Sequence, residues 1–312
     1  MPACPGTGSE PLSRSGYPAA ANGEPLPATR ADPARPLGHV PAPITVLDRQ
    51  SFEVGIPNVA RIYDALLGGK DNYAVDREAA LALTAAIPSA ARAARDNREF
   101  LGRAVHFLAA EAGITQFLDI GTGLPTQGNV HEIAQAVNRC ARVVYVDNDP
   151  VVLAHGRALL ADNPNVHVVE GDLEYPRELL GRKEVRQRID FSKPVAVLLV
   201  AVLHFLDDSL RPWEILEAIT HRIAPASYVV ISHVTGDQIS AEAASEAREI
   251  YADFAQGTTR SRARIMSFFE GLELVPPGLI DVADWRPGRD LPTRPTLFWG
   301  GVGCKPGMGD DQ

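Results

Sequence analysis

The chain has 312 residues, a formal net charge of −9 and three cysteines. The acidic balance weighs against a large nucleic-acid-binding surface, because such surfaces usually carry a basic footprint. Cys4, Cys140 and Cys304 are too far apart for a zinc motif or a disulfide framework, which favours a reducing cytoplasm. No apolar run is long enough to span a bilayer, and the N-terminus lacks the apolar centre of a signal peptide. We therefore expect a cytoplasmic protein with no metal, nucleic acid or membrane among its partners.

Composition divides the chain into four segments. Residues 1–43 are rich in Pro, Ala and Gly without a sustained apolar period, which predicts a disordered tail. Residues 44–112 are expected to form an N-terminal helical cap or lid, and residues 113–305 a Rossmann-like domain. Residues 306–312 are expected to form a flexible C-terminus.

The cap begins with a helix whose N-cap candidate is Asn58 and whose end is marked by Gly68-Gly69. Spacing alone favours a surface helix with a glycine cap; the alternative is a lid in which Tyr63, Lys70 and Asn72 close over a ligand. Asp76 is expected to cap a second helix to about residue 86.

A third helix is predicted from residue 88 or 89 to about residue 112. Its mixed charges are typical of a solvated face. The alternative places Arg95, Asp96 and Asn97 in a ligand cleft.

Beyond residue 113, strand-like and helix-like segments alternate, which predicts a parallel sheet with helices on both faces. The predicted strands are 116–120, 142–146, 166–170, 194–200, 227–233, 272–275 and 296–302. The predicted helices are 126–138, 150–161, one from 209 or 212 to about 224, 239–256 and 260–270.

Polar residues stand where the predicted strands end, and ligands bind at that edge of an open sheet. The segment Asp119-Ile120-Gly121-Thr122-Gly123 makes a sharp strand-to-helix turn, where glycines let a ligand approach the backbone. Asp147 ends the next strand and can accept hydrogen bonds from both hydroxyls of a ribose. Asp172 and Leu173 follow the third strand, where an adenine could stack on the leucine and donate to the carboxylate. Together these residues predict a site for an adenosyl ligand.

The loop after the first strand also distinguishes between adenosyl ligands. A dinucleotide fingerprint has a third glycine, whereas Thr126 stands there, after Pro125. Proline lacks an N–H group that a pyrophosphate would use, and S-adenosylmethionine has no phosphate. The loop therefore favours S-adenosylmethionine over the nicotinamide cofactor of an oxidoreductase.

From about Pro57 onward, the chain resembles a bacterial family of S-adenosylmethionine-dependent methyltransferases of largely unassigned substrate, within the class I, Rossmann-like enzymes. The segments that carry the resemblance are 60–64 with 67–73, 117–126, 144–150 and 202–205. The resemblance implies a seven-stranded sheet with an antiparallel last strand, and it favours the lid interpretation of residues 61–73.

The resemblance also implies roles for individual residues. Asp119, Gly121 and Gly123 would line the methionine end of the cofactor, Asp147 would hold the ribose and Asp172 the adenine. The other predicted cofactor contacts are Thr122, Asn148, Leu173, Ala201, Tyr63, Lys70 and Asn72.

A methyltransferase needs a general base only if its acceptor carries a proton on the attacking atom. His204, after the fourth strand, is the first candidate, with His233 and Tyr63 behind it. No Asn-Pro-Pro-Tyr sequence follows that strand, so the usual signature of nucleic-acid base or protein amide methylation is absent. We therefore expect a small-molecule acceptor, with S-adenosylhomocysteine as the second product. The alternative is a non-catalytic S-adenosylmethionine-binding regulator or scaffold, and the oligomeric state is left open.

Overall fold

The computed structural model describes residues 55–125, 128–160, 162–252, 255, 257–288 and 295–307, all within the compact unit Phe52–Gln312. The predicted tail, residues 1–43, and residues 308–312 of the predicted C-terminus lie outside the described residues. No helix among the described residues is long and apolar enough to cross a membrane.

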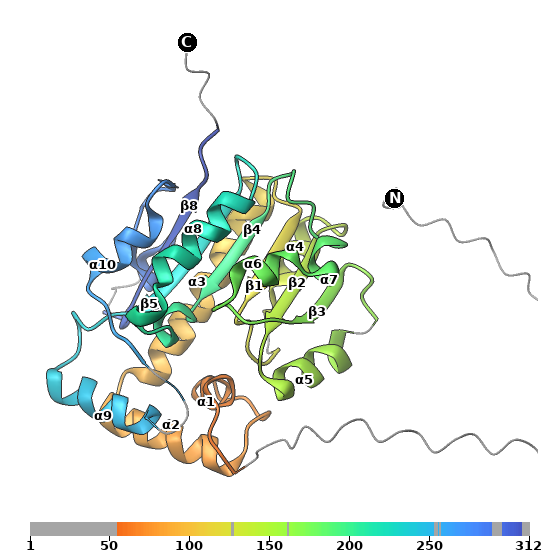
Figure 1. Ribbon diagram of the computed structural model, residues 1–312. Helices are drawn as coiled ribbons and strands as arrows, with labels where there is room; N and C mark the ends of the chain where they lie inside the picture. The colour runs from red at the N-terminus through yellow and green to blue at the C-terminus, as the bar shows by residue number, and fades with distance from the viewer. Residues whose placement is uncertain are drawn as a thin grey trace, which may run out of the picture. The chain divides into compact units, whose positions relative to one another are not determined.

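One mixed sheet forms the centre of the fold, with strand order β3-β2-β1-β4-β5-β8-β6 and β7 paired to β8 (Figure 1). Its strands are β1 Gln116–Ile120, β2 Arg142–Asp147, β3 Val166–Glu170, β4 Ala196–Val200, β5 Tyr228–Val234, β6 Glu273–Leu274, β7 Ile280–Asp281 and β8 Phe298–Cys304. The first five strands are parallel, and β8 runs antiparallel to β5. The predicted class I sheet is confirmed, and the two-residue strand β7 is an addition to the prediction.

The helices of the described residues are α1 Val59–Leu66, α2 Ala74–Ala86, α3 Ala90–Ala110, α4 Val130–Val137, α5 Pro150–Leu160, α6 Pro176–Gly181, α7 Lys183–Arg186, α8 Pro212–Arg222, α9 Ala241–Tyr251 and α10 Arg262–Met266. Short 3-10 turns follow β4 at Leu203–Phe205 and Asp208–Leu210, and two more lie at Ser267–Phe269 and Val282–Asp284. The sequence did not predict α6 and α7.

The strands alternate their apolar side chains between two cores, as the period of a strand requires. Leu118 of β1 belongs to a core that also contains Leu179 of α6 and Ile215 of α8. Its neighbour Phe117 belongs to the opposite core, with Leu108 of α3 and further residues of α4. Helices therefore cover both faces, and the carboxyl ends of the parallel strands remain for a site.

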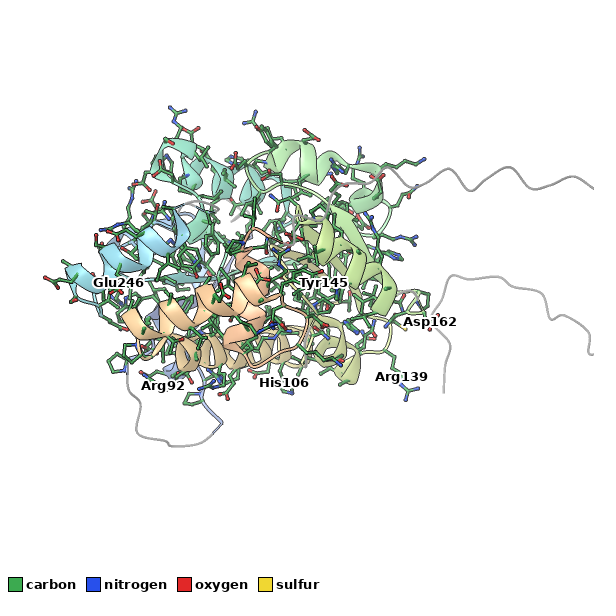
Figure 2. The ribbon with its side chains drawn as sticks, turned by 90° about the horizontal axis from the view of Figure 1, so that it is seen from below. Arg92, His106, Arg139, Tyr145, Asp162 and Glu246 are labelled. Atoms are coloured by element: carbon green, nitrogen blue, oxygen red, sulfur yellow. The ribbon has the colours of Figure 1, made fainter. Side chains whose placement is uncertain are left out.

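Helices α1, α2 and α9 gather at that edge, and a view from the same side places them in front of the sheet (Figures 1 and 2). Of the predicted cap 44–112, α3 instead packs on the sheet, through side chains such as Phe100 and Leu108. A buried ion pair joins Arg61 of α1 to Asp76 of α2, with Nε and Oδ2 2.8 Å apart. The predicted capping role of Asp76 is wrong in position: α2 begins at Ala74, and Asp76 accepts from the Tyr73 amide at 2.8 Å.

Candidate functional site

A cavity of about 480 Å³ opens at the carboxyl edge of the parallel strands. It lies where the strand order reverses between β1 and β4, which is the usual ligand position in such sheets. Its volume falls within the range of about 300–1,000 Å³ that is usual for small-molecule sites.

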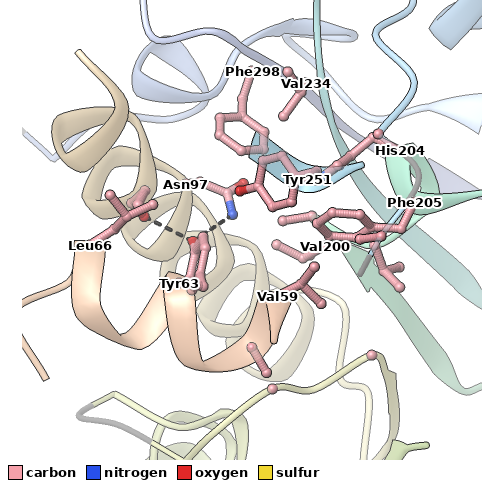
Figure 3. Close-up of a pocket in the computed structure, with 18 of the residues that line it drawn as sticks. Val59, Tyr63, Leu66, Asn97, Val200, His204, Phe205, Val234, Tyr251 and Phe298 are labelled. Atoms are coloured by element: carbon pink, nitrogen blue, oxygen red, sulfur yellow. Dashed lines mark hydrogen bonds between the residues drawn. The ribbon is translucent and has the colours of Figure 1, made fainter. Parts of the chain in front are cut away.

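The cavity has two chemically different halves. We call the part lined by strand ends and their loops the strand-tip half; it includes Arg98, Asp119, Gly121, Gly123, Asp147, Asn148, Asp172 and Leu173. We call the part lined by the helices and the β4 loop the helical half; it includes Tyr63, Leu83, Ile87, Asn97, His204, Phe205, Tyr251 and Phe298 (Figure 3).

Asp119, the fourth residue of β1, is the most perturbed acid of the strand-tip half. Its side chain is buried and accepts a hydrogen bond from Thr122 Oγ1 at 3.1 Å. Burial raises the pKa of Asp119 to about 6, although the nearby Arg98 guanidinium pulls it in the opposite direction. Arg98 Nε has no hydrogen-bond partner and is itself buried. The two side chains thus offer opposite charges to a ligand at the same place.

The turn after β1 depends on Gly121, which has φ +72°. A Cβ at this position would overlap the side chain of Val202, which follows β4. Glycine therefore lets the ends of β1 and β4 approach each other and leaves the backbone of the turn open to the cavity.

Asp147, the last residue of β2, contacts this turn through a hydrogen bond. Its Oδ2 accepts from the Gly123 amide at 2.9 Å and its Oδ1 from the Asp149 amide at 3.0 Å. The side chain is 8% exposed, and burial raises the pKa of its carboxyl against these hydrogen bonds. A carboxylate has about four acceptor positions, so each oxygen can still accept one hydroxyl of a ligand.

The remaining strand-tip predictions also line the cavity: Asn148, Asp172, Leu173, Thr122 and Ala201. Leu173 is buried, whereas Asp172 accepts from the Glu174 amide at 2.9 Å through Oδ1. An apolar surface and a carboxylate oxygen therefore lie next to each other at the end of β3, as the adenine prediction requires.

Tyr63 and Asn97 form a hydrogen-bonded pair in the helical half (Figure 3). The Tyr63 hydroxyl donates to the carbonyl oxygen of Ala94 at 2.9 Å, and Asn97 Nδ2 donates to the same hydroxyl at 2.9 Å. Burial raises the pKa of Tyr63, so its proton stays in place. Because that proton is committed to a carbonyl, Tyr63 is a positioning residue here and we no longer assign it the role of base.

His204 lines the cavity from the first 3-10 turn after β4 and is 9% exposed. Its Nδ1 is buried without a hydrogen-bond partner. Burial lowers the pKa of His204 well below the usual value, and the neighbouring His233 and Arg260 lower it further. The imidazole is therefore neutral at physiological pH and can accept a proton only weakly.

His233 does not line the cavity. Its Nε2 accepts from Arg260 Nη1 at 2.8 Å, and its Nδ1 lies 2.6 Å from the carbonyl oxygen of Val234. Because arginine can only donate and a carbonyl can only accept, the ring must carry its proton on Nδ1. Both nitrogens are thus occupied, and we withdraw the prediction that His233 is a base.

Arg260, which sequence reasoning missed, holds the β4 loop in place. It is 4% exposed and donates to the carbonyl oxygens of Leu203 and Leu206 at 3.1 and 2.7 Å. Its Nη2 also lies 2.6 Å from Asp208 Oδ1. Leu203 and Leu206 lie on either side of His204 in the sequence, so Arg260 fixes the loop that carries His204.

Lys70 and Asn72 do not line the cavity, which corrects their assignment as cofactor contacts. Asn72 Nδ2 donates to Asp64 Oδ2 at 2.8 Å and to the Gly69 carbonyl at 3.0 Å, and Lys70 is exposed. A Cβ on Gly69 would overlap the Asp64 carboxylate. The polar loop after α1 therefore fastens that helix instead of contacting a ligand.

Asn58 supplies a connection that no sequence signal indicated. Its Oδ1 caps α1 by accepting from the Ala60 amide at 2.8 Å, as predicted, and its Nδ2 donates to Asp149 Oδ2. The start of α1 is thereby tied to the loop after β2, beside Asp147.

Comparisons with known proteins identify the family of the chain. A family model described as S-adenosyl methyltransferase matches residues 46–306. A solved structure from Thermobifida fusca with a provisional methyltransferase assignment is 41% identical, with a TM-score of 0.78; the match covers 84% of this chain and 100% of that one. A DUF574 family protein from Streptomyces avermitilis is 38% identical, also with a TM-score of 0.78, over 82% of this chain and 100% of that one. Among curated proteins, none matches. The chain belongs to the S-adenosyl methyltransferase family, and its cofactor is S-adenosylmethionine.

Proposed function

We propose that the protein transfers a methyl group to a small-molecule acceptor bound in the helical half, while the strand-tip half holds the cofactor. The observation that carries this proposal is the continuity of the two halves in one cavity, where Asp119, Asp147 and Asp172 line one part and apolar side chains the other. A cofactor held at the strand ends would face an acceptor under the helices.

The residues of the strand-tip half fit the cofactor chemically. Asp147 has acceptor positions left for the two ribose hydroxyls, and Leu173 beside Asp172 suits an adenine with its amino group. Asp119 would pair with the ammonium group of the methionine portion, and the unpartnered Nε of Arg98 with its carboxylate.

Bound S-adenosylmethionine supplies an electrophilic methyl group on a cationic sulfur. The chain then needs to orient the acceptor, exclude water and receive any proton that the acceptor loses. Helices α1, α2 and α9 line the helical half and shield it, and Arg260 fixes the loop that presents His204. His204 is the one base candidate that we retain among the described residues, and its low basicity suits an acceptor of low pKa or one that needs no base.

A small acceptor is supported by the walls of the cavity. Side chains of four helices, α1, α2, α3 and α9, and of β8 line the helical half, so an acceptor atom must enter between them. The chain-wide charge of −9 adds no attraction for nucleic acid.

The test uses cofactor labelled in its methyl group and the full chain. After incubation with bacterial extract, we expect label in the low-molecular-weight fraction and none in protein or nucleic acid. Label confined to macromolecules would contradict a small acceptor. Tight binding of the cofactor without transfer to any fraction would favour the non-catalytic regulator.

A further inference from the structure

Asn97 Oδ1 is a buried acceptor without a partner in the helical half. Asn97 is 1% exposed, and its amide orientation follows from its neighbours. The single proton of the Tyr63 hydroxyl is donated to the Ala94 carbonyl, so Asn97 must donate to that hydroxyl through Nδ2. The amide oxygen is therefore the atom left over. A buried acceptor of this kind destabilises the protein unless a ligand satisfies it.

The walls around this oxygen carry little charge. Burial raises the pKa of Tyr251 to about 12 and keeps His204 neutral. Among the described residues that line the helical half, Asp64 is occupied by Asn72 and the Asp71 amide, and Arg248 is exposed. An ionised acceptor would lose its hydration here without gaining a buried counter-charge.

Aromatic rings, aliphatic side chains and alanines line the helical half. The rings of His204 and Phe205 have centroids 4.3 Å apart, and those of Phe205 and Tyr251 6.1 Å apart (Figure 3). Leu83 of α2, Ile87 just after it, and alanines of α3 and α9 complete the lining: Ala90, Ala93, Ala94, Ala244 and Ala247. Aromatic rings pack favourably against other flat rings, and the alanines leave space beside them, so this lining suits a flat apolar body.

From these observations we propose that the acceptor is a neutral, flat, largely apolar molecule with a hydroxyl group that donates a hydrogen bond to Asn97 Oδ1. This inference rests on the proposed function, because it assigns the helical half to the acceptor. The shared feature of such molecules is an aromatic or similarly flat body with one O–H donor.

The experiment measures binding of three naphthalene probes to the full chain saturated with S-adenosylhomocysteine. We expect 2-naphthol to bind at least tenfold more tightly than 2-methoxynaphthalene, which has no donor, and 2-naphthoate not to bind detectably. Equal binding of 2-naphthol and 2-methoxynaphthalene, or tighter binding of 2-naphthoate, would overturn the inference while leaving the proposed function intact. Failure of S-adenosylhomocysteine itself to bind would overturn both.

Two variants test whether Asn97 accepts the hydrogen bond and whether the probe binds in the helical half. In N97L the preference for 2-naphthol over 2-methoxynaphthalene should fall to about onefold, with S-adenosylhomocysteine affinity unchanged within about threefold. A preserved preference with a more than tenfold loss of S-adenosylhomocysteine affinity would instead place Asn97 at the cofactor, and the inference would be wrong.

The second variant, A244W, fills the helical half and should abolish 2-naphthol binding. Its matched control, A241W, alters an exposed residue of the same helix α9 that does not line the cavity. Unchanged binding of 2-naphthol to A244W would also overturn the inference.

Discussion

The two halves of the cavity are built in different ways. In the strand-tip half, each polar residue except Arg98 of α3 stands at or just after a strand end. Asp119 accepts a hydrogen bond from Thr122 and Asp147 accepts one from the Asp149 amide, each within its own turn. In the helical half, the lining comes from α1, α2, α3, α9 and the β4 loop, and the orphan polar atoms are Asn97 Oδ1 and His204 Nδ1. The proposed cofactor portion is thus encoded mainly by short local motifs, whereas the proposed acceptor portion arises from packing between distant segments.

The largest effect should come from Arg260, which supports the boundary of the helical half. R260M would leave two carbonyl oxygens and His233 Nε2 without their donor, whereas the 52% exposed side chain of Asp208 can be rehydrated. A buried acceptor without a donor costs about 1–3 kcal/mol, so we expect the free energy of unfolding to fall by about 3–5 kcal/mol. Any folded fraction should still bind S-adenosylhomocysteine but lose methyl transfer. Chemical denaturation and calorimetry measure the two effects.

The control for this variant is R264M, which alters a 45% exposed side chain 3.9 Å from the same Asp208. It should change the free energy of unfolding by less than about 1 kcal/mol. If R260M were as stable and active as R264M, the anchoring role of Arg260 would be refuted.

The strand-tip half is tested by D147A, which removes the proposed acceptor of two ribose hydroxyls. Hydrogen bonds to a charged acceptor contribute about 1.5–3 kcal/mol each, so affinity for S-adenosylhomocysteine should fall at least a hundredfold in calorimetry. D162A, which alters an exposed aspartate beyond the end of α5, is the matched control and should bind normally (Figure 2). Unchanged affinity in a folded D147A protein would remove the ribose assignment.

Asp119 gives the strand-tip half a pH dependence that the helical half lacks. The pKa of this carboxyl is raised to about 6 in the folded protein, whereas in the unfolded chain it is near 3.8. If the ionised form binds the ammonium group, the dissociation constant of S-adenosylhomocysteine should rise about tenfold for each pH unit below 6. In D119N the constant should be weaker and nearly flat between pH 5 and 7, and a steep slope there would assign the titration to another group.

Protonation of the Asp119 carboxyl is expected to weaken cofactor binding but to stabilise the folded protein. Between pH 3.8 and about 6 the folded protein holds the proton more tightly than the unfolded chain does, so this contribution to stability is present at low pH and is lost as the pH rises. Because asparagine does not ionise, D119N should not lose this stability as the pH rises. A ligand-free D119N protein that is much less stable than wild type at pH 7 would contradict the burial argument.

The smallest effect is expected for Y63F in the helical half. Loss of the hydroxyl leaves Asn97 Nδ2 without its acceptor and loosens the orientation of Oδ1, so acceptor affinity should fall about three- to tenfold. The pH profile of methyl transfer should stay the same, because Tyr63 moves no proton in our account. Loss of turnover with unchanged acceptor affinity would restore Tyr63 as a catalytic residue.

The contrast between the halves also explains what the sequence could and could not reveal. The glycine turn and the acids at the ends of β1, β2 and β3 could be predicted, because each of these residues lies in its strand or within a few residues of it. The helix start at Asn58 was equally local, but its bond to Asp149 joins residues 91 positions apart and leaves no pattern.

Two histidines, one in the turn after β4 and one in β5, show what the sequence could not predict. His204 and His233 have the same residue type and similar positions after or within a strand, yet Arg260 occupies only the ring of His233. Lys70 and Asn72 were assigned to the cofactor as part of a lid that the family resemblance favoured, whereas Asn72 satisfies Asp64 within the loop. Only the packed structure decides which polar atoms are left for a ligand, as Asn97 Oδ1 is.

The division of the cavity is tested most directly by a crystal structure of the protein grown with S-adenosylhomocysteine. We expect the ribose hydroxyls on Asp147, the adenine beside Asp172 and Leu173, and the sulfur directed towards the helical half. A bound ligand whose adenosine lies under α2 and α9, or away from Asp147, would contradict the division of the cavity.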